Sequence, residues 1–350
     1  MNFASDNTAG APPTIIDAIV RTNAGFALGY GNDDLTRAVE RRIGDIFERD
    51  AAVFLVPTGT AANALALAHL APPWGAVLCH ARAHIATDEC GAPEFFGGGL
   101  KLIGLPGDGC KLAVDTVRAA IARHSGHRPH FVQPAALSLS QVSEAGTIYS
   151  LAEIEALAGV AHAAGLGVHM DGARFANALV RSNASPAAMT WRAGVDALSF
   201  GATKGGVLAA EAVVIFDRAK ADAMHERRKR GGHLVSKHRF LAAQLDAFLS
   251  DGNWLAWARH ANAMADRLAA GLAAGGLKPV WPVEGNLVFV VLPREADARL
   301  RAAGASYYAR DSDGLPDGIA MGPGAAFARL VTSFATTDTE VDRFVELACQ

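Results

Sequence analysis

Short apolar stretches alternate with helix-forming segments between residues 51 and 249, and this alternation restricts the fold more than any other feature. Ser150 and Glu153, for example, form a capping box that opens a helix running to about Ala164. Strands that alternate with helices pair mostly in parallel, with helices on both faces of the sheet. The sequence therefore predicts an α/β fold, with strands at 51–56, 76–79, 100–105, 131–139, 197–200 and 212–216, and a turn followed by a strand over 165–170.

The character of the chain changes near Asp251. A long alanine-rich helix runs to Ala273, and further strands and helices follow it. This order is typical of a small α+β unit. We therefore expect an N-terminal arm and helix over 1–24, a large domain over 25–249 and a small C-terminal domain over 250–350. In that last part, strands are expected at 286–292 and 328–333, and helices at 295–302 and from Asp338 onward.

Composition excludes several classes of protein. Hydrophobic residues make up 51% of the 350 residues and charged residues 19%, as in a folded soluble enzyme. A net charge of −3, without a long run of one sign, argues against a nucleic-acid-binding protein. The four cysteines form no zinc-binding spacing, so we expect no metal and a reducing compartment. The start of the chain has no secretory signal pattern, and the stretch 51–81 is too interrupted to span a membrane, so a cytoplasmic protein is expected.

A single lysine, Lys204, lies in a glycine-rich turn directly after the apolar stretch 197–200. Lysine is rare in apolar surroundings without a reason. There its pKa falls, and the neutral amine can attack a carbonyl and form a Schiff base. The alternative is an ordinary lysine at a strand end that extends to water. The turn by itself leaves both interpretations open.

Asp171 adds weight to the first interpretation. It falls at the carboxyl end of a predicted strand, where α/β folds place groups that bind ligands. Pyridoxal phosphate (PLP) needs this combination, a lysine for its aldehyde and a carboxylate for its protonated ring nitrogen. Taken alone, Asp171 could equally well be a helix N-cap or a turn aspartate. Together with Lys204 it indicates a PLP site.

Gly59 and Thr60 follow another apolar stretch and open a helix rich in alanine and leucine. Free backbone N–H groups and hydroxyls at a helix N-terminus can bind an anion such as a phosphate. The alternative is simple helix capping by Thr58 or Thr60. The segment matches neither a Walker loop nor a dinucleotide fingerprint.

Other polar residues have both a functional and a structural interpretation. His84 could stack on a flat cofactor or act as an acid or base, or it could be an ordinary loop histidine. Arg329 lies in an apolar strand, where its fork could bind a carboxylate or a structural acid. Tyr30 by itself reads as a loop residue. The basic run 227–230 reads as a solvated helix face, from which one or two side chains could reach a phosphate.

Taken together, these motifs resemble the fold-type-I PLP enzymes, and within them the threonine aldolases of the β-eliminating lyase group. The segments 87–94 and 189–191 are similar to the low-specificity L-threonine aldolases of bacteria. The resemblance spans nearly the whole chain. It rests on Ser5-Asp6-Asn7, Tyr30-Gly31-Asn32-Asp33, Pro57 to Asn63, Ala83-His84, His169 to Arg174, Gly201 to Gly205 and Arg329 to Thr332.

The resemblance implies a role for each matching residue. Lys204 would carry PLP as a Schiff base, Asp171 would pair with the ring nitrogen, and His84 would stack on the ring. Gly59 and Thr60 would bind the phosphate, and Arg174 would lie beside the cofactor. The substrate carboxylate would be bound by Ser5, Arg174 and Arg329. Tyr30 would enter the site from a partner subunit.

One position departs from the family pattern. Some members carry a second histidine where this chain has Glu144, so Glu144 is expected to contact the substrate in its place. The lysine motif reads Ala-Thr-Lys-Gly, which keeps a hydroxyl before the lysine.

The implied reaction is PLP-dependent retro-aldol cleavage of L-threonine, L-allo-threonine and related β-hydroxy amino acids, phenylserine included, to glycine and an aldehyde. His84 would act as the base, directly or through a water. The resemblance also implies a homodimer or homotetramer with active sites at subunit interfaces. Two alternatives remain. One is a PLP-dependent β-eliminating lyase or dehydratase, and the other is a non-catalytic protein that binds a phosphate ligand.

Overall fold

The computed structural model describes residues 1–126, 128–316 and 318–350. Within these ranges the core is a seven-stranded sheet in the order β1-β7-β6-β5-β4-β2-β3. The strands β3, β2, β4, β5 and β6 are parallel, and β7 runs antiparallel to both β6 and β1. The predicted mostly parallel α/β sheet is confirmed. Its strands are β1 Ala52–Val56, β2 Gly75–His80, β3 Lys101–Leu105, β4 Gln133–Ser140, β5 Gly167–Gly172, β6 Ala197–Phe200 and β7 Glu211–Ile215.

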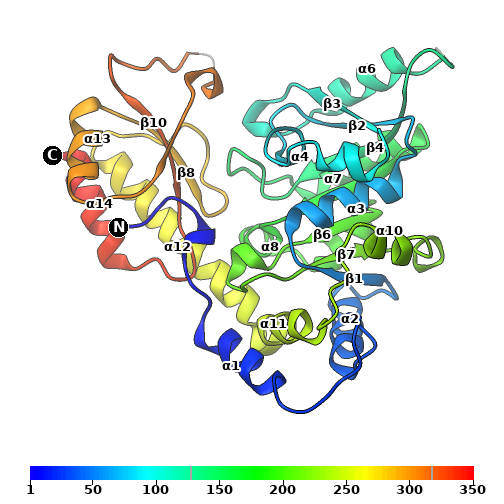
Figure 1. Cartoon of the computed structure of the whole chain (residues 1–350). Helices are drawn as coiled ribbons and strands as arrows, with labels where there is room; N and C mark the ends of the chain where they lie inside the picture. The colour runs from blue at the N-terminus through cyan, green and yellow to red at the C-terminus, as the bar shows by residue number, and fades with distance from the viewer. Residues whose placement is uncertain (127, 317) are drawn as a thin grey trace.

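Helices flank this sheet and connect its strands (Figure 1). The predicted capping box of Ser150 and Glu153 is present at the start of α7. The helices of this part are α1 Pro13–Thr22, α2 Asp34–Ile46, α3 Gly59–Leu70, α4 His84–Thr87, α5 Ala92–Phe96, α6 Val114–His124, α7 Leu151–Ala163, α8 Phe175–Ser182, α9 Pro186–Met189, α10 Met224–Arg230 and α11 Arg239–Leu249.

A separate antiparallel sheet in the order β8-β10-β9 is formed by the C-terminal part of the chain. Figure 1 shows α12 running from the side of α11 toward this small sheet. The strand β9 was not expected, because its three residues are all exposed and carry no apolar alternation. The elements here are α12 Asn253–Ala274, β8 Leu287–Leu292, α13 Arg294–Ala302, β9 Tyr308–Arg310, β10 Ala326–Val331 and α14 Asp338–Cys349.

The N-terminus packs against this C-terminal part, and Figure 1 shows both ends of the chain beside the small sheet. Asn2 pairs with Ser306 in an isolated parallel bridge. Phe3 is fully buried, and its ring lies 5.0 Å from the ring of Phe344 in α14. The arm that follows Phe3 is therefore fixed at its start, between the small sheet and the large one.

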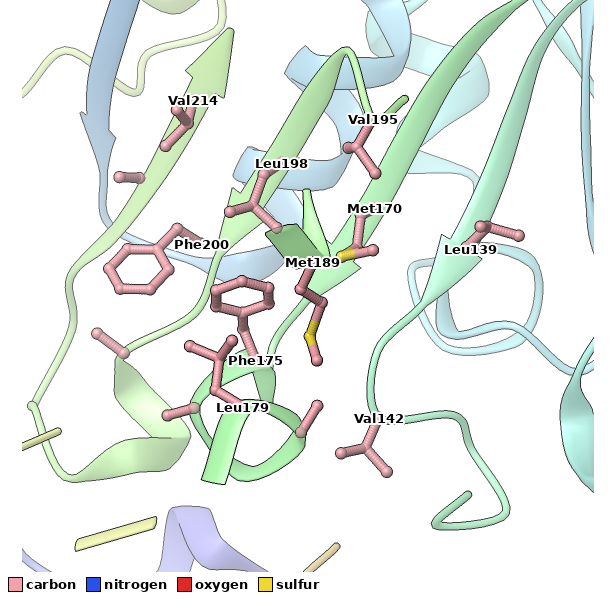
Figure 2. Packing of buried hydrophobic residues seen from close by; sticks show 14 of the residues in the cluster. Leu139, Val142, Met170, Phe175, Leu179, Met189, Val195, Leu198, Phe200 and Val214 are labelled. Carbon is pink, nitrogen blue, oxygen red and sulfur yellow. The ribbon is translucent and has the colours of Figure 1, made fainter. Parts of the chain in front are cut away.

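Side chains of the large sheet alternate between its two faces, as in any strand. On one face Met170, Leu198 and Phe200 belong to the large apolar cluster, and Figure 2 shows them near Phe175 and Leu179 of α8. The interdigitation of these side chains excludes water from that face. At β5 and β6 this face therefore contributes apolar packing and not ligand-binding groups.

The opposite face lies under α3, which contacts β5, β6 and β7. Ser138, His169, Asp171 and Ser199 point to this face, because each stands next in sequence to a residue of the large apolar cluster. They lie near the carboxyl ends of three neighbouring parallel strands. The alternation along the strands thus collects these four polar groups on the face of the sheet that α3 covers.

No helix in the described part of the chain is long and apolar enough to cross a membrane.

Candidate active site

A cavity of about 370 Å³ lies at the carboxyl ends of the parallel strands, next to the N-terminus of α3. Three of the ten predicted site residues, Ser5, Tyr30 and Arg329, are not part of its wall. The other seven line it together, although they are scattered over the sequence from residue 59 to residue 204. These seven are Gly59, Thr60, His84, Glu144, Asp171, Arg174 and Lys204.

Lys204 lies in a single 3-10 turn, Thr203–Gly205, directly after β6. A buried carboxylate holds this turn, because the backbone N–H groups of Ala202 and Thr203 donate to Glu211 at 2.7 and 3.3 Å. Burial raises the pKa of Glu211. The Lys204 amine is half-buried and has no hydrogen-bond partner within the described residues. The fold therefore fixes the backbone of the lysine and leaves its nitrogen available.

The turn also requires glycine at position 201. A Cβ atom there would lie 2.5 Å from the Cα atom of Ala173. Such a contact is far inside the van der Waals distance, so only glycine allows the strand exits of β5 and β6 to approach this closely. The close approach brings Lys204 and Asp171 to the same cavity.

Asp171 lies at the end of β5 and is 5% exposed. Its Oδ1 accepts a hydrogen bond from the backbone N–H of Ala173 at 3.0 Å, and its Oδ2 accepts one from Nδ2 of Asn63 at 2.9 Å. Burial opposes its ionisation, but the positive charge of Lys204 leads the interactions that hold the pKa of Asp171 below its ordinary value. Asp171 is thus a buried, ionised carboxylate at the floor of the cavity.

A neutral histidine supports Asp171 from within the sheet. His169 is fully buried between Ser138 and Ser199, and each hydroxyl lies 2.9 Å from one of its ring nitrogens. Burial lowers its pKa to about 4. An uncharged imidazole thus occupies the position two residues before Asp171 on the same face of β5.

His84 opens α4 and faces the cavity from the other side. Its Nδ1 lies 2.8 Å from Oε1 of Glu89, and the same oxygen accepts a hydrogen bond from Nδ2 of Asn63 at 2.8 Å. Glu89 is fully buried and His84 is about one-third exposed. The hydrogen bond to Glu89 raises the pKa of His84 against the effect of burial. Asn63 thereby connects the histidine and its carboxylate to Asp171.

The N-terminus of α3 forms the third wall. Thr58 is the N-cap, and its hydroxyl accepts a hydrogen bond from the backbone N–H of Ala61 at 3.1 Å. The N–H groups of Gly59 and Thr60, in the first turn, have no partner inside the helix. A Cβ atom added at Gly59 would meet nothing within 4 Å. Capping and anion binding are therefore compatible here, because Thr58 caps the helix while the next two N–H groups stay open to the cavity.

The two arginines expected at the substrate carboxylate differ in their surroundings. Arg174 is buried and forms a bidentate pair with Asp6, at 2.7 and 3.0 Å. Arg329 donates to the carbonyl of Ala4 at 3.3 Å. Burial lowers the pKa of Arg329 to about 10, and the neighbouring charge of Arg174 adds to the effect. Of the two, Arg329 is the one that lacks a carboxylate at hydrogen-bond distance among the described residues.

Ser5 and Tyr30 lie outside the cavity wall. Ser5 caps the short turn Asp6–Thr8, and its hydroxyl accepts a hydrogen bond from the backbone N–H of Asn7 at 3.1 Å. Tyr30 is 49% exposed on a surface loop, with Nζ of Lys229 4.5 Å from the centre of its ring. Neither side chain takes part in the cavity of its own chain.

Four contributors were not predicted as site residues: Asp6, Asn63, Glu89 and Glu211. The first three stood inside motifs already recognised, but their roles depend on contacts with distant residues. Glu211 could have been predicted from the sequence, because a carboxylate at the start of a fully buried strand needs hydrogen-bond donors close by.

These groups fit pyridoxal phosphate by their chemistry. The cavity offers an amine, a buried carboxylate, an imidazole and open N–H groups, which match an aldehyde, a protonated ring nitrogen, a flat ring face and a phosphate. The Oδ1 atom of Asn63 is buried in the same wall and lacks a hydrogen-bond partner in the described chain. The donor set therefore suits this cofactor without any rearrangement of the strands.

Comparison with known proteins agrees with this chemistry. A family model described as "Beta-eliminating lyase" matches residues 2–295. A low-specificity L-threonine aldolase of Pseudomonas aeruginosa is 40% identical over 349 residues, which cover 99% of this chain and 95% of that protein. One from a Pseudomonas species is 40% identical over 308 residues and covers 87% and 88% of the two chains.

Solved structures add the three-dimensional match. The threonine aldolase of Leishmania major superposes with a TM-score of 0.91 at 31% identity, over 99% of this chain and 98% of that one. A serine palmitoyltransferase of Sphingomonas wittichii reaches 0.71 at 15% identity, over 99% and 86% of the two chains, which is a likeness of fold alone.

Proposed function

This chain belongs to the beta-eliminating lyase family, and from that premise we propose that it is a PLP-dependent threonine aldolase. It cleaves L-threonine, L-allo-threonine and related L-β-hydroxy-α-amino acids, including phenylserine, to glycine and an aldehyde. The observation that carries the proposal is the juxtaposition of the Lys204 amine and the buried, ionised Asp171 in one cavity.

Each wall of the cavity holds one part of the cofactor in this proposal. Lys204 would hold the cofactor through its aldehyde carbon, and Asp171 would keep a proton on the ring nitrogen. The N–H groups of Gly59 and Thr60 hold the phosphate, and His84 covers the ring. When bound, PLP withdraws electrons from the bonds at the substrate Cα.

The protein then selects which bond breaks and moves the protons. Arg329, which has no carboxylate partner among the described residues, holds the substrate carboxylate and so orients the Cα–Cβ bond. Arg174, paired with Asp6, and Ser5, bonded to the N–H of Asn7, would support it from the side of the N-terminal arm. Nε2 of His84 takes the proton of the β-hydroxyl, the Cα–Cβ bond breaks, and the aldehyde leaves. A proton delivered to Cα completes glycine. Glu144, in the cavity wall, contacts the substrate on the side of its hydroxyl.

The proposal includes a cytoplasmic homodimer or homotetramer in which Tyr30 enters the cavity of the neighbouring subunit. It is supported by apolar side chains exposed near Tyr30, with Phe26 fully exposed, Leu28 at 69% and Val20 of α1 at 66%. Apolar patches of this kind usually mark an interface. Sedimentation should give a particle of two or four times 36.4 kDa. A monomer that retains full activity would contradict this part.

The decisive experiment is the absorbance spectrum of the purified protein before and after addition of L-threonine, with glycine and acetaldehyde measured in parallel. We expect a band above ~400 nm that changes with substrate, and equal amounts of both products. The Lys204→Ala variant should lose the band and the activity. Release of ammonia and a keto acid would favour the β-eliminating lyase instead, and a protein that stays colourless with added PLP would favour a phosphate-binding protein.

A further inference from the structure

Two side chains, Glu89 and Asn63, link His84 to Asp171 through one amide nitrogen. Nδ2 of Asn63 donates to Oε1 of Glu89 at 2.8 Å and to Oδ2 of Asp171 at 2.9 Å. Both acceptors are carboxylate oxygens, so the amide must turn its nitrogen, not its oxygen, toward them. The two N–H bonds of one side chain therefore fix the relative positions of two buried carboxylates.

The same constraint fixes the tautomer of His84. Burial raises the pKa of Glu89, whereas its hydrogen bonds with His84 and Asn63 favour the ionised form. An ionised carboxylate has no proton to donate, so Nδ1 of His84 carries the proton that the two groups share at 2.8 Å. In the neutral ring Nε2 is then a free acceptor. Nε2 has no hydrogen-bond partner among the described residues, and His84 lines the cavity. Glu89 thus presents a basic nitrogen to the space where the substrate must lie.

The burial of Glu89 is hard to explain by stability alone. Its side chain is fully buried, and no lysine or arginine in the described ranges lies within ion-pair distance of it. Its second oxygen, Oε2, is buried without a hydrogen-bond partner in the same part of the structure. Burying a carboxylate is costly unless a cation compensates it. The cation available at hydrogen-bond distance is His84 in its protonated form.

We propose that Glu89 is a positioning residue for the aldol cleavage, which holds His84 with Nε2 toward the substrate and stabilises the imidazolium that forms during the reaction. This inference rests on the proposed function. In the forward step the β-hydroxyl proton moves to Nε2, the O–H electron pair forms the C=O bond of the aldehyde at Cβ, and the Cα–Cβ electron pair stays with Cα, where bound PLP would stabilise it by withdrawing electrons. The charge that appears on His84 is paired with Glu89 in a water-poor site, where such a pair interacts strongly. The proton then passes from Nε2 to Cα, directly or by way of solvent, which completes glycine and restores the neutral ring for the next turnover.

Asn63 extends this role to the cofactor end of the cavity. Because it bonds both carboxylates, it keeps Glu89 and Asp171 at a fixed separation. The charged groups that act on His84 are Glu89, Asp171, Lys204 and Glu144, and of these Glu89 is the one at hydrogen-bond distance. The Asn63 amide therefore fixes the position of His84, through Glu89, relative to that of Asp171.

The test compares wild type with Glu89→Gln in the PLP-loaded enzyme. Glutamine keeps the size of the side chain and one accepting oxygen but removes the charge. We expect kcat for L-threonine to fall about 10²-fold, within the range of general base catalysis. Since the carboxylate raises the pKa of His84, the acidic limb of kcat/KM should move to lower pH in this variant. Glu155→Gln, on the exposed side of α7, is the matched control and should change neither value.

A second variant separates charge from packing. Glu89→Asp retains the negative charge, so its acidic limb should stay near that of wild type even if kcat falls. An equal shift in both variants would overturn the inference. So would a Glu89→Gln enzyme with the wild-type pH profile, whether or not it is less stable.

A measurement on the wild-type holoenzyme needs no substitution at Glu89. Nitrogen NMR of the histidines, with His84 identified by the loss of its signal in His84→Gln, should show the proton on Nδ1 at pH 8. A proton on Nε2 would overturn the inference. If wild type released no glycine at all, the proposed function would fail together with the inference, whereas an active wild type with any of the results above would overturn the inference alone.

Discussion

Two clusters of buried charge lie close together in this protein, and they differ in how completely they are paired. In the first, Asp6 accepts two hydrogen bonds from Arg174 and one from Asn286, at 2.7 to 3.1 Å. In the second, Asp171 and Glu89 share a single amide donor, and each lies near a base that can bind something else. The first cluster is closed and the second is open.

The difference separates structure from function. The closed cluster ties the N-terminal arm to the exit of β5 and to Asn286 ahead of β8, and its two charged groups are paired with each other, although Oδ1 of Asn286 is buried without a partner in the described structure. In the open cluster, buried polar atoms of Asn63 and Glu89 are left without partners in the described structure. Native proteins rarely tolerate such atoms unless a ligand or a reaction uses them. Substitutions in the two clusters should therefore change different properties.

The largest effect is expected at the open cluster, in Asp171→Asn. The amide cannot keep a proton on the ring nitrogen of the cofactor, and kcat should fall by about 10³-fold, equivalent to ~4 kcal/mol of transition-state stabilisation. Steady-state kinetics at saturating cofactor measure this loss, with Asp115→Asn on α6 as the control. Activity within a factor of ten of wild type would show that Asp171 belongs with the structural charges.

The closed cluster should respond in stability, through Asp6→Ala. Removal of one partner leaves the buried Arg174 uncompensated, which costs about 3–5 kcal/mol of unfolding free energy in other proteins. Urea denaturation of wild type and variant measures the difference. Burial opposes the ionisation of Asp6, but Arg174 holds its pKa below the ordinary value, so its contribution is present above that value and is lost as the pH falls through the lowered pKa. The two proteins should therefore converge in strongly acidic buffer, and a constant difference would contradict the pairing.

The substitution Arg329→Lys tests the same difference between paired and unpaired groups, here for the two arginines Arg174 and Arg329. Arg174 has its carboxylate, whereas Arg329 has only a backbone carbonyl in the described structure, and so is free to bind the substrate. Lysine cannot form the bidentate contact. We expect KM for L-threonine to rise about tenfold, or ~1.4 kcal/mol, with little change in unfolding free energy. Arg343→Lys on α14 is the control, and an unchanged KM would assign the carboxylate to another residue.

The smallest effect is expected at Glu40, a partly buried carboxylate of α2 outside both clusters, in Glu40→Gln. Burial raises the pKa of Glu40 to about 7, and it makes no hydrogen bond with the described residues. A carboxyl whose pKa is raised on folding stabilises the protein below its unfolded pKa of about 4.5, and this stabilisation is lost as the pH rises through 7. Glu40→Gln should therefore be about 1–2 kcal/mol more stable than wild type at pH 8 and nearly equal at pH 4.5. Equal stability at pH 8 would show that Glu40 is compensated.

Local patterns in the sequence were sufficient to predict most of the frame. The strand at 197–200, the capping box at Ser150 and the helix opened by Thr58 all lie where the pattern indicated. Each depends on neighbours within a few residues, because apolar alternation and capping act over one or two turns of backbone. Lys204 and Asp171 could be placed at strand exits for the same reason, since Asp171 lies near the end of one recognisable strand and Lys204 in the turn after another.

The connections between these pieces were decided only by the tertiary structure. Asn63 lies 26 residues from Glu89 and 108 from Asp171, yet its single amide bonds both. Whether Arg174 binds Asp6 or a ligand depends on how an arm 168 residues away is fixed by Phe3. Hydrogen bonds of this kind require distances correct to a few tenths of an ångström, and these arise from the packing of α3 on the sheet, not from local propensity. The sequence by itself therefore determined which chemical groups the protein has at its strand ends, and the packing determined which of them are paired and which remain free to react.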